Sequence, residues 1–127
     1  QGLLLQRFIP PAGRRDLRVL TIGGKMVGAV EMTPAAGDFR SNFHLTGTGR
    51  TVDIQPDLQQ MALSAARAVG LAIAGVDFII DPEGRAYVLE VNYAPGFRGL
   101  EAATGMDAAG HIIDYAISFL NKEKRKS

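Results

Sequence analysis

The sequence contains no cysteine and no tryptophan, and aromatic residues make up only 7% of it. The absence of cysteine excludes disulfide bonds and thiolate metal sites, and it is compatible with a reducing compartment, so we expect a cytoplasmic protein. No apolar run approaches the roughly 20 residues that a membrane-spanning helix needs. The formal net charge is only +1, which favours neither nucleic acid nor a membrane surface as a partner.

Hydrophobic residues make up 46% of the 127 residues, which is enough for the core of one domain of modest size, residues 1–127. The chain opens on Gln1 inside an apolar run rather than on Met, so we expect it to be part of a longer protein. Residues 121–127 form a basic tail, which we interpret as the solvated end of a helix.

The spacing of apolar residues, glycine and proline predicts an α+β domain. The expected elements are a strand over 3–9, a hairpin over 16–33 that turns at Gly23-Gly24, a loop over 33–53 with one short strand, a helix over 56–70, a hairpin over 74–92 and a helix over 107–126. Two hairpins imply an antiparallel sheet. The two amphipathic helices are expected to cover one face of it.

The second hairpin carries polar side chains in strands that are otherwise apolar. If residues 81–84 close its turn directly, Asp77 lies opposite Val88 and Glu90 is the diagonal neighbour of Asp77. Side chains alternate along a strand, so Asp77, Glu90 and Asn92 would share a face, with the two acids about 7–8 Å apart between backbones. A bulge at the turn would slip this register by one residue.

Oxygen ligands without His or Cys favour Mg²⁺ or Mn²⁺ over zinc, and Mg²⁺ typically takes one or two carboxylates together with substrate phosphates. Asp77, Glu90 and Asn92 are therefore candidate metal ligands. The alternative is that these groups pair with nearby arginines or line a hydrated sheet face. A second polar group, Arg40-Ser41-Asn42 within GDFRSN, cannot face a core with all three side chains, and exposure to solvent is its ordinary explanation.

Four segments together resemble a known family. They are QRFIP with GRRDLRV, GDFRSN, AGVDF with DPEGRAYVLEVNYAPG, and TGMDAAGHIIDY. Over about residues 3–120 they are similar to the C-terminal half of ATP-grasp ligases, and most of all to the RimK-type group. That group contains ATP-dependent glutamate ligases that modify a ribosomal protein, with relatives that join amino acids to small carboxylates.

The resemblance implies a role for each matching residue. Asp77, Glu90 and Asn92 would hold Mg²⁺ between the ATP phosphates. Arg40 would lie near the transferred phosphoryl group as a catalytic residue, with Ser41 and Asn42 beside it. Asp16 falls on an acid of the nucleotide site. The hinge strand, whose backbone meets adenine in the family, corresponds to Gln6, Arg7, Phe8 and Ile9, with Arg7 standing where an acid is usual.

The implied activity of the parent protein is an ATP-dependent carboxylate–amine ligation through an acyl phosphate, adding glutamate or a similar amino acid to a protein or small-molecule acceptor. Its partners would be ATP and the carboxylate and amino-acid substrates. One alternative is an ATP-grasp module that binds nucleotide and Mg²⁺ without turnover, and another is a purely structural α+β domain. The first ATP-grasp subdomain is absent from these residues, so we expect the isolated chain to be inactive and to bind ATP weakly, with a free surface that allows homo-oligomers.

Overall fold

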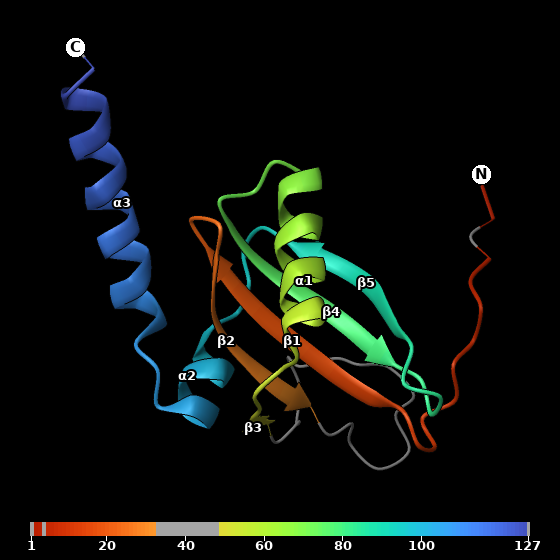
Figure 1. Ribbon diagram of the computed structural model, residues 1–127. Helices are drawn as coiled ribbons and strands as arrows, with labels where there is room; N and C mark the ends of the chain where they lie inside the picture. Colours follow the sequence, from red (N-terminus) through yellow and green to blue (C-terminus); the bar gives the residue numbers. More distant parts are fainter. Residues whose placement is uncertain (1, 4, 33–48, 127) are drawn as a thin grey trace.

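The computed structural model describes residues 2–3, 5–32 and 49–126 of the chain. This part forms a five-stranded sheet in the order β3-β2-β1-β4-β5 (Figure 1), with antiparallel pairing throughout. The elements are β1 (Arg15–Ile22), β2 (Lys25–Met32), β3 (Gly49–Thr51), α1 (Pro56–Ala68), β4 (Ile73–Ile80), β5 (Ala86–Asn92), α2 (Arg98–Thr104) and α3 (Ala108–Lys124). The predicted α+β class with an antiparallel sheet is confirmed.

The first hairpin turns where the sequence predicts it. Gly23 and Gly24 have φ angles of 58° and 78°, and two successive positive φ angles define the tight turn whose twist matches that of the flanking strands. The short strand expected within 33–53 is β3, while residues 33–48 lie outside the described part of the chain.

The register predicted for the second hairpin is wrong near its turn. Asp81 and Arg85 pair through Asp81 N–H, which donates to the Arg85 carbonyl at 2.9 Å, and Gly84 has a φ of 84°. This is a three-residue loop that ends in a left-handed glycine, a common alternative to the two-residue turn. Ile80 therefore pairs with Ala86 and not with Arg85.

A β-bulge further along the second hairpin cancels the one-residue shift in register that the turn introduces. Phe78 pairs with Val88, but the next pair is Asp77 with Glu90, so Leu89 is an extra residue in β5. Such a β-bulge returns the following side chains to the face they would otherwise leave. Asp77 and Glu90 thus become direct partners instead of diagonal neighbours.

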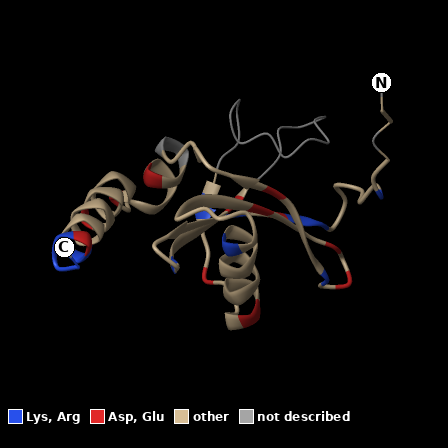
Figure 2. Cartoon of the chain, turned by 90° about the horizontal axis from the view of Figure 1, so that it is seen from above, with Lys and Arg blue, Asp and Glu red and all other residues tan. Residues whose placement is uncertain are grey.

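The helices lie on opposite faces of the sheet, so the expectation that both cover one face is wrong. Leu17 and Val19 of β1 pack in one cluster with α1, whereas Leu20 and Ile22 pack with residues of α2 and α3. Figure 2 shows α1 on one side of the sheet and α2 on the other. The reason is that β1 is buried on both faces, and each apolar face requires its own cover.

Helix α3 is only partly packed. Its first residue, Ala108, is buried, and Ile112 packs against the sheet, whereas the apolar side chains of Ile113 and Leu120 are 56% and 59% exposed. Figure 1 shows the helix extending away from the sheet. Its last turn carries Lys122 and Lys124 and is exposed, as predicted for the basic tail. None of the described helices is long and apolar enough to cross a membrane.

The strand predicted over 3–9 is absent from the described residues of that segment. Leu3 and Leu5 are 96% and 89% exposed, and Phe8 is 65% exposed. An apolar pattern favours a strand, but a strand also needs a partner ladder for its backbone groups. The described sheet provides no ladder to this segment.

An acid on β2 ties three strands together at the edge of the sheet. Glu31 accepts hydrogen bonds from Arg15 Nε of β1 at 2.7 Å and from Arg50 Nη2 of β3 at 2.6 Å. The hydrogen bond from Arg15 lowers the pKa of Glu31 below its ordinary value of 4.5, against the opposing effect of burial, and Arg50 adds to the lowering.

This network should make part of the stability depend on pH. A carboxyl whose folded pKa is lowered stabilises the fold above its unfolded pKa, and it loses that contribution as the pH falls through the folded value. We expect Glu31→Gln to lower the free energy of unfolding by at most about 1 kcal/mol near neutral pH, because both arginines are largely solvated. Urea denaturation near pH 7 and near pH 3 should show this difference shrinking in acid; a constant difference would contradict it.

Candidate active site

A row of polar side chains crosses the sheet on the face opposite α1. Strand pairing places Arg18 of β1 opposite Asp77 of β4, and Asp77 opposite Glu90 of β5. Directly paired residues point to the same face, so these three side chains lie side by side. Asn92 follows two residues later on β5, opposite Gly75, and shares the face. The predicted grouping of Asp77, Glu90 and Asn92 is therefore present, although it arises through a different register.

Asp77 forms an ion pair with Arg18, a residue to which the sequence analysis gave no role. Arg18 Nε and Nη2 donate to the two carboxylate oxygens of Asp77 at 2.7 and 2.6 Å, and both side chains are buried. Burial disfavours the charged guanidinium, but the hydrogen bonds to Asp77 and the carboxylates of Asp77 and Glu90 outweigh it and raise the pKa of Arg18. The pair is thus a charged, two-point ion pair that fixes the Asp77 carboxylate in one orientation.

Glu90 and Asn92 are more open than Asp77. The Glu90 side chain is exposed, and the half-buried Asn92 accepts a hydrogen bond at Oδ1 from the Ala94 backbone N–H at 3.1 Å. Among the residues with described positions, no group of three His, Cys, Asp or Glu residues could hold a metal ion.

This donor set suits one kind of metal. Its members supply only oxygen ligands, and Arg18 offsets one of the two carboxylate charges. Such a set fits Mg²⁺ that completes its coordination with phosphate oxygens and water, and it does not fit a metal held by protein ligands alone. The metal role of Asp77, Glu90 and Asn92 stays a prediction, and Asp77 makes the arginine pairing that was its alternative.

A second buried ion pair lies further along β1 on the same face. Asp16 pairs with Arg14, whose Nε lies 3.1 Å from Asp16 Oδ1, and Arg14 Nη1 donates to the Ile9 carbonyl at 2.8 Å. Two predicted nucleotide-site residues, Asp16 and Ile9, are thus connected through a residue that was not predicted. The sequence GRRD over 13–16 places two arginines beside the acid, but it does not show which of them pairs with it.

The remaining predicted residues divide into two groups. Gln6, Arg7 and Phe8 are exposed and belong to no described strand. Arg40, Ser41 and Asn42 lie outside the described residues, so the structure does not place them and their roles stay predictions.

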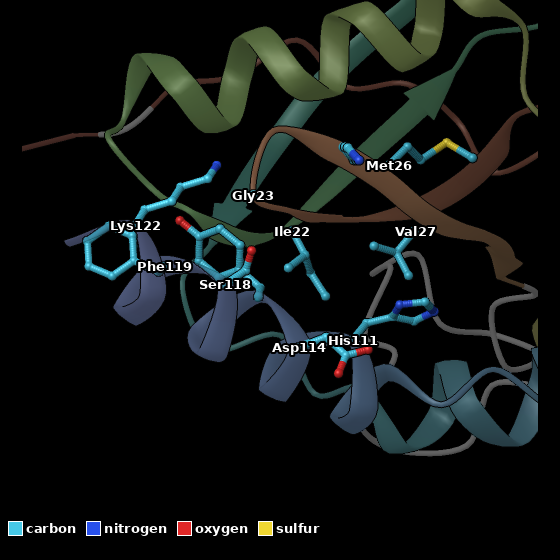
Figure 3. Close-up of a pocket in the computed structure, with 11 residues that line it drawn as sticks. Ile22, Gly23, Met26, Val27, His111, Asp114, Ser118, Phe119 and Lys122 are labelled. Carbon is cyan, nitrogen blue, oxygen red and sulfur yellow. The ribbon is translucent and has the colours of Figure 1, made fainter. Parts of the chain in front are cut away.

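One cavity among the described residues lies away from the polar row. It is an open groove of about 690 Å³ between the β1–β2 hairpin and α3, and Figure 3 shows His111, Asp114 and Lys122 of α3 along it. None of the predicted site residues lines this groove. The chemistry of the polar row, and not the size of a cavity, therefore defines the candidate site.

Solved structures share this arrangement of sheet and helices. The ATP-grasp ligase PsnB, complexed with a minimal precursor, Mg and ADP, is 28% identical with a TM-score of 0.70, over 83% of this chain and 33% of that chain. D-alanine–D-alanine ligase from Bacillus anthracis, complexed with ATP, has a TM-score of 0.60 over 86% of this chain and 40% of that chain; at 22% identity it is a likeness of fold alone. The fold is therefore that of the ATP-grasp class.

The family within this class follows from the sequence match. A model of the RimK-like ATP-grasp domain matches residues 1–116, and the chain belongs to this family. A probable alpha-L-glutamate ligase of Parasynechococcus marenigrum is 52% identical over 112 residues, 88% of this chain and 24% of that protein. A probable alpha-L-glutamate ligase 2 of Hahella chejuensis is 44% identical over 97% of this chain and 41% of that protein. The chain spans less than half the length of these curated relatives.

Proposed function

We propose that the protein containing this chain is an ATP-dependent carboxylate–amine ligase that adds glutamate, or a similar amino acid, to a carboxylate acceptor. The observation that carries the proposal is the row of Arg18, Asp77 and Glu90, with Asn92 beside it, on one face of a RimK-like ATP-grasp sheet. The similarity to probable alpha-L-glutamate ligases supports glutamate as the amine substrate. The PsnB complex with precursor peptide PsnA2 supports a peptide or protein as the acceptor class.

The chemistry of the reaction explains why such a site is needed. A carboxylate is a poor electrophile because its leaving group would be oxide, and transfer of a phosphoryl group from ATP provides a better leaving group. The amine of the incoming amino acid then attacks the acyl carbon, forming an amide and releasing phosphate. When bound, Mg²⁺ would neutralise and align the phosphates of ATP during the transfer.

The described residues would have two different roles at this site, metal binding and the orientation of a metal ligand. Asp77, Glu90 and Asn92 would bind the metal through oxygen. Arg18 holds the Asp77 carboxylate in a fixed orientation, so that it need not reorganise when the charged ligand arrives. Because Glu90 is exposed and Asp77 buried, the ligand would approach from the side of β5.

We also propose that Arg40 donates to the transferred phosphoryl group or to the oxyanion that forms during amine attack. The expected result for Arg40→Lys is a fall in kcat of about 10²-fold or more, the scale of removing one oxyanion donor, because lysine keeps the charge and loses the planar two-point fork. Steady-state kinetics at saturating ATP would measure the change. Wild-type kcat in Arg40→Lys would mean that a simple charge is sufficient.

ADP release by the full-length protein tests the proposed function. We expect release that requires Mg²⁺, a carboxylate acceptor and an amino acid together, with glutamate giving the highest kcat/KM among the amino acids. A protein that binds Mg·ATP without releasing ADP for any substrate pair would instead be a nucleotide-binding module. A protein that neither binds Mg·ATP nor changes its melting temperature with Mg²⁺ would be a structural domain.

A further inference from the structure

The row of strand positions next to the polar row contains two glycines. Leu20 of β1 pairs with Gly28 of β2 on one side and with Gly75 of β4 on the other. Gly75 pairs in turn with Asn92 of β5. Each of these positions is two residues along its strand from the neighbouring row, so both rows lie on the same face of the sheet. Two of the four positions in this second row therefore present no side chain.

The chain that follows β5 runs over this row. β5 is one edge of the described sheet, and α2 lies by the other edge, where Thr51 Oγ1 of β3 donates to the Ala103 carbonyl at 3.2 Å. The connecting residues 93–97 end at Phe97, which packs in the same cluster as Leu20. The connection and α2 thus cross the sheet on the face that carries the polar row.

Pro95 occupies the space that a side chain at position 75 would fill. Pro95 is buried, and a Cβ atom added to Gly75 would lie 2.7 Å from Pro95 Cβ. This is well inside the roughly 3.5–4.0 Å at which two carbon atoms pack. The missing side chain of Gly75 therefore allows the connection to lie directly against β4, two residues from Asp77.

The same connection orients Asn92. The Ala94 N–H donates to Asn92 Oδ1 at 3.1 Å, so the direction of the side-chain amide depends on where Ala94 lies. An amide oxygen has two lone pairs, and one remains for a cation when the other accepts this hydrogen bond. Because Pro95 follows Ala94 directly, the contact between Pro95 and Gly75 also fixes the position of the donor.

We propose that Gly75 is a positioning residue for the candidate site: it accommodates Pro95, and through this contact it holds Asn92 in the orientation required of a metal ligand. Gly75 has no side chain that could touch a metal or a nucleotide, so it acts through residues 93–97. The inference rests on the proposed function for the metal at Asn92. It predicts a change in the contribution of Mg²⁺ to nucleotide binding, which a general loss of stability would not produce selectively.

Calorimetric titration of the full-length protein with ATP, once with Mg²⁺ and once with EDTA, tests this role without requiring turnover. We expect Gly75→Ala to weaken Mg·ATP binding about tenfold, the scale of losing a group that orients a metal ligand, and to leave the affinity for metal-free ATP unchanged. The matched control is Gly28→Ala in the same row. Its added methyl group would meet the end of the flexible Met106 side chain, on the other side of Leu20 from Asn92, and both affinities should stay unchanged.

A reciprocal substitution tests the steric argument. Pro95→Gly alone should also weaken Mg·ATP binding, because it leaves the space above Gly75 empty and frees the backbone at position 95. Combining Gly75→Ala with Pro95→Gly should recover most of the wild-type affinity, because the new methyl group then meets only the Cα atom of residue 95, at 3.7 Å. Pro95→Gly and the double variant still test the inference if Gly75→Ala does not fold.

A double-mutant cycle with Asn92→Ala tests whether Gly75 acts through Asn92. If it does, Gly75→Ala should add nothing to the loss of Mg·ATP affinity that Asn92→Ala causes. If the two effects multiply, Gly75 acts by another route and the inference is wrong.

The inference is also overturned by unchanged Mg·ATP affinity in Gly75→Ala and Pro95→Gly, by an equal loss of affinity for metal-free ATP, by an equal loss in Gly28→Ala, or by no recovery in the double variant. A wild-type protein whose affinity for ATP does not depend on Mg²⁺ would overturn it together with the metal role of Asn92. A wild-type protein that binds Mg·ATP more tightly than ATP but releases no ADP would remove the proposed reaction and leave the positioning role of Gly75 intact.

Discussion

Replacing Arg18 by methionine should lower the free energy of unfolding by about 3–5 kcal/mol, the usual result of leaving one member of a buried ion pair without its partner. Asp77 is 5% exposed and accepts two short hydrogen bonds from Arg18. Methionine fills similar space and offers no donor, so the Asp77 carboxylate would lose both bonds in a site with little access to water. Urea denaturation of the chain near pH 7 would measure the change.

Two further variants separate the unpaired charge from the loss of side-chain volume. The double variant Arg18→Met, Asp77→Leu should recover most of the lost stability, because no buried charge remains and apolar replacements of a buried pair are often neutral. The control Arg15→Met removes an arginine whose side chain is 48% exposed, and it should change stability by at most about 1 kcal/mol. Equal destabilisation by Arg18→Met and Arg15→Met would show that the buried Arg18–Asp77 pair contributes no more to the free energy of unfolding than the more exposed Arg15–Glu31 pair.

Glu90→Gln is expected to reduce Mg²⁺-dependent turnover of the full-length protein by about 10²–10³-fold, the scale of removing a group that stabilises developing charge. Glutamine keeps the shape of the side chain and removes the charge that attracts a divalent cation. Because Glu90 is exposed, its replacement should leave the melting temperature almost unchanged. The measurements are kcat at saturating substrates and the Mg²⁺ concentration for half-maximal rate, which should rise.

The matched control for this variant is Glu83→Gln. Glu83 is an exposed acid in the turn of the same hairpin, so the substitution changes the net charge equally without touching the polar row. It should leave turnover and the Mg²⁺ requirement unchanged. Wild-type Mg²⁺ dependence in Glu90→Gln would remove Glu90 from the metal site. Asp77→Asn is a less specific probe, because it would weaken the pair with Arg18 at the same time.

Local signals in the sequence were sufficient for several elements. Gly23-Gly24 predicted the first turn, and Gly70, at a φ of 70°, ends the helix that was expected to stop there. The apolar spacing of that helix predicts a face that includes Leu58, Met61, Ala62 and Val69; Leu58 and Ala62 are buried, whereas Met61 and Val69 are 40% and 54% exposed. In each case the deciding interactions lie within a few residues along the chain, so a pattern of neighbours is enough to reveal them.

The errors came from interactions between distant residues. Arg18 and Asp77 are 59 positions apart, and nothing local selects that arginine from the three at 14, 15 and 18. The predicted 3–9 strand failed because its pattern contains no information about a partner strand. The second hairpin was predicted in a regular register because sequence alone did not distinguish a bulged turn from a tight one, although the shared face of Asp77, Glu90 and Asn92 was correctly identified.

The extra residue in β5 has a consequence for how this hairpin tolerates changes of length. Side chains alternate between the two faces along a regular ladder, so the number of paired residues between the turn and Glu90 decides which face receives the acid, and an unpaired residue does not count. With Leu89 unpaired, deletion of this residue would produce an uninterrupted ladder and still leave Glu90 opposite Asp77. An inserted residue that paired with Asp77 would instead place Glu90 opposite Val76, directing Glu90 and Asn92 towards α1 and bringing apolar neighbours into the polar row. Homologous hairpins that differ in length here should therefore be aligned by their strand pairing. An alignment gap placed by residue similarity alone can match residues of the polar row in one protein with residues of the buried apolar face in another.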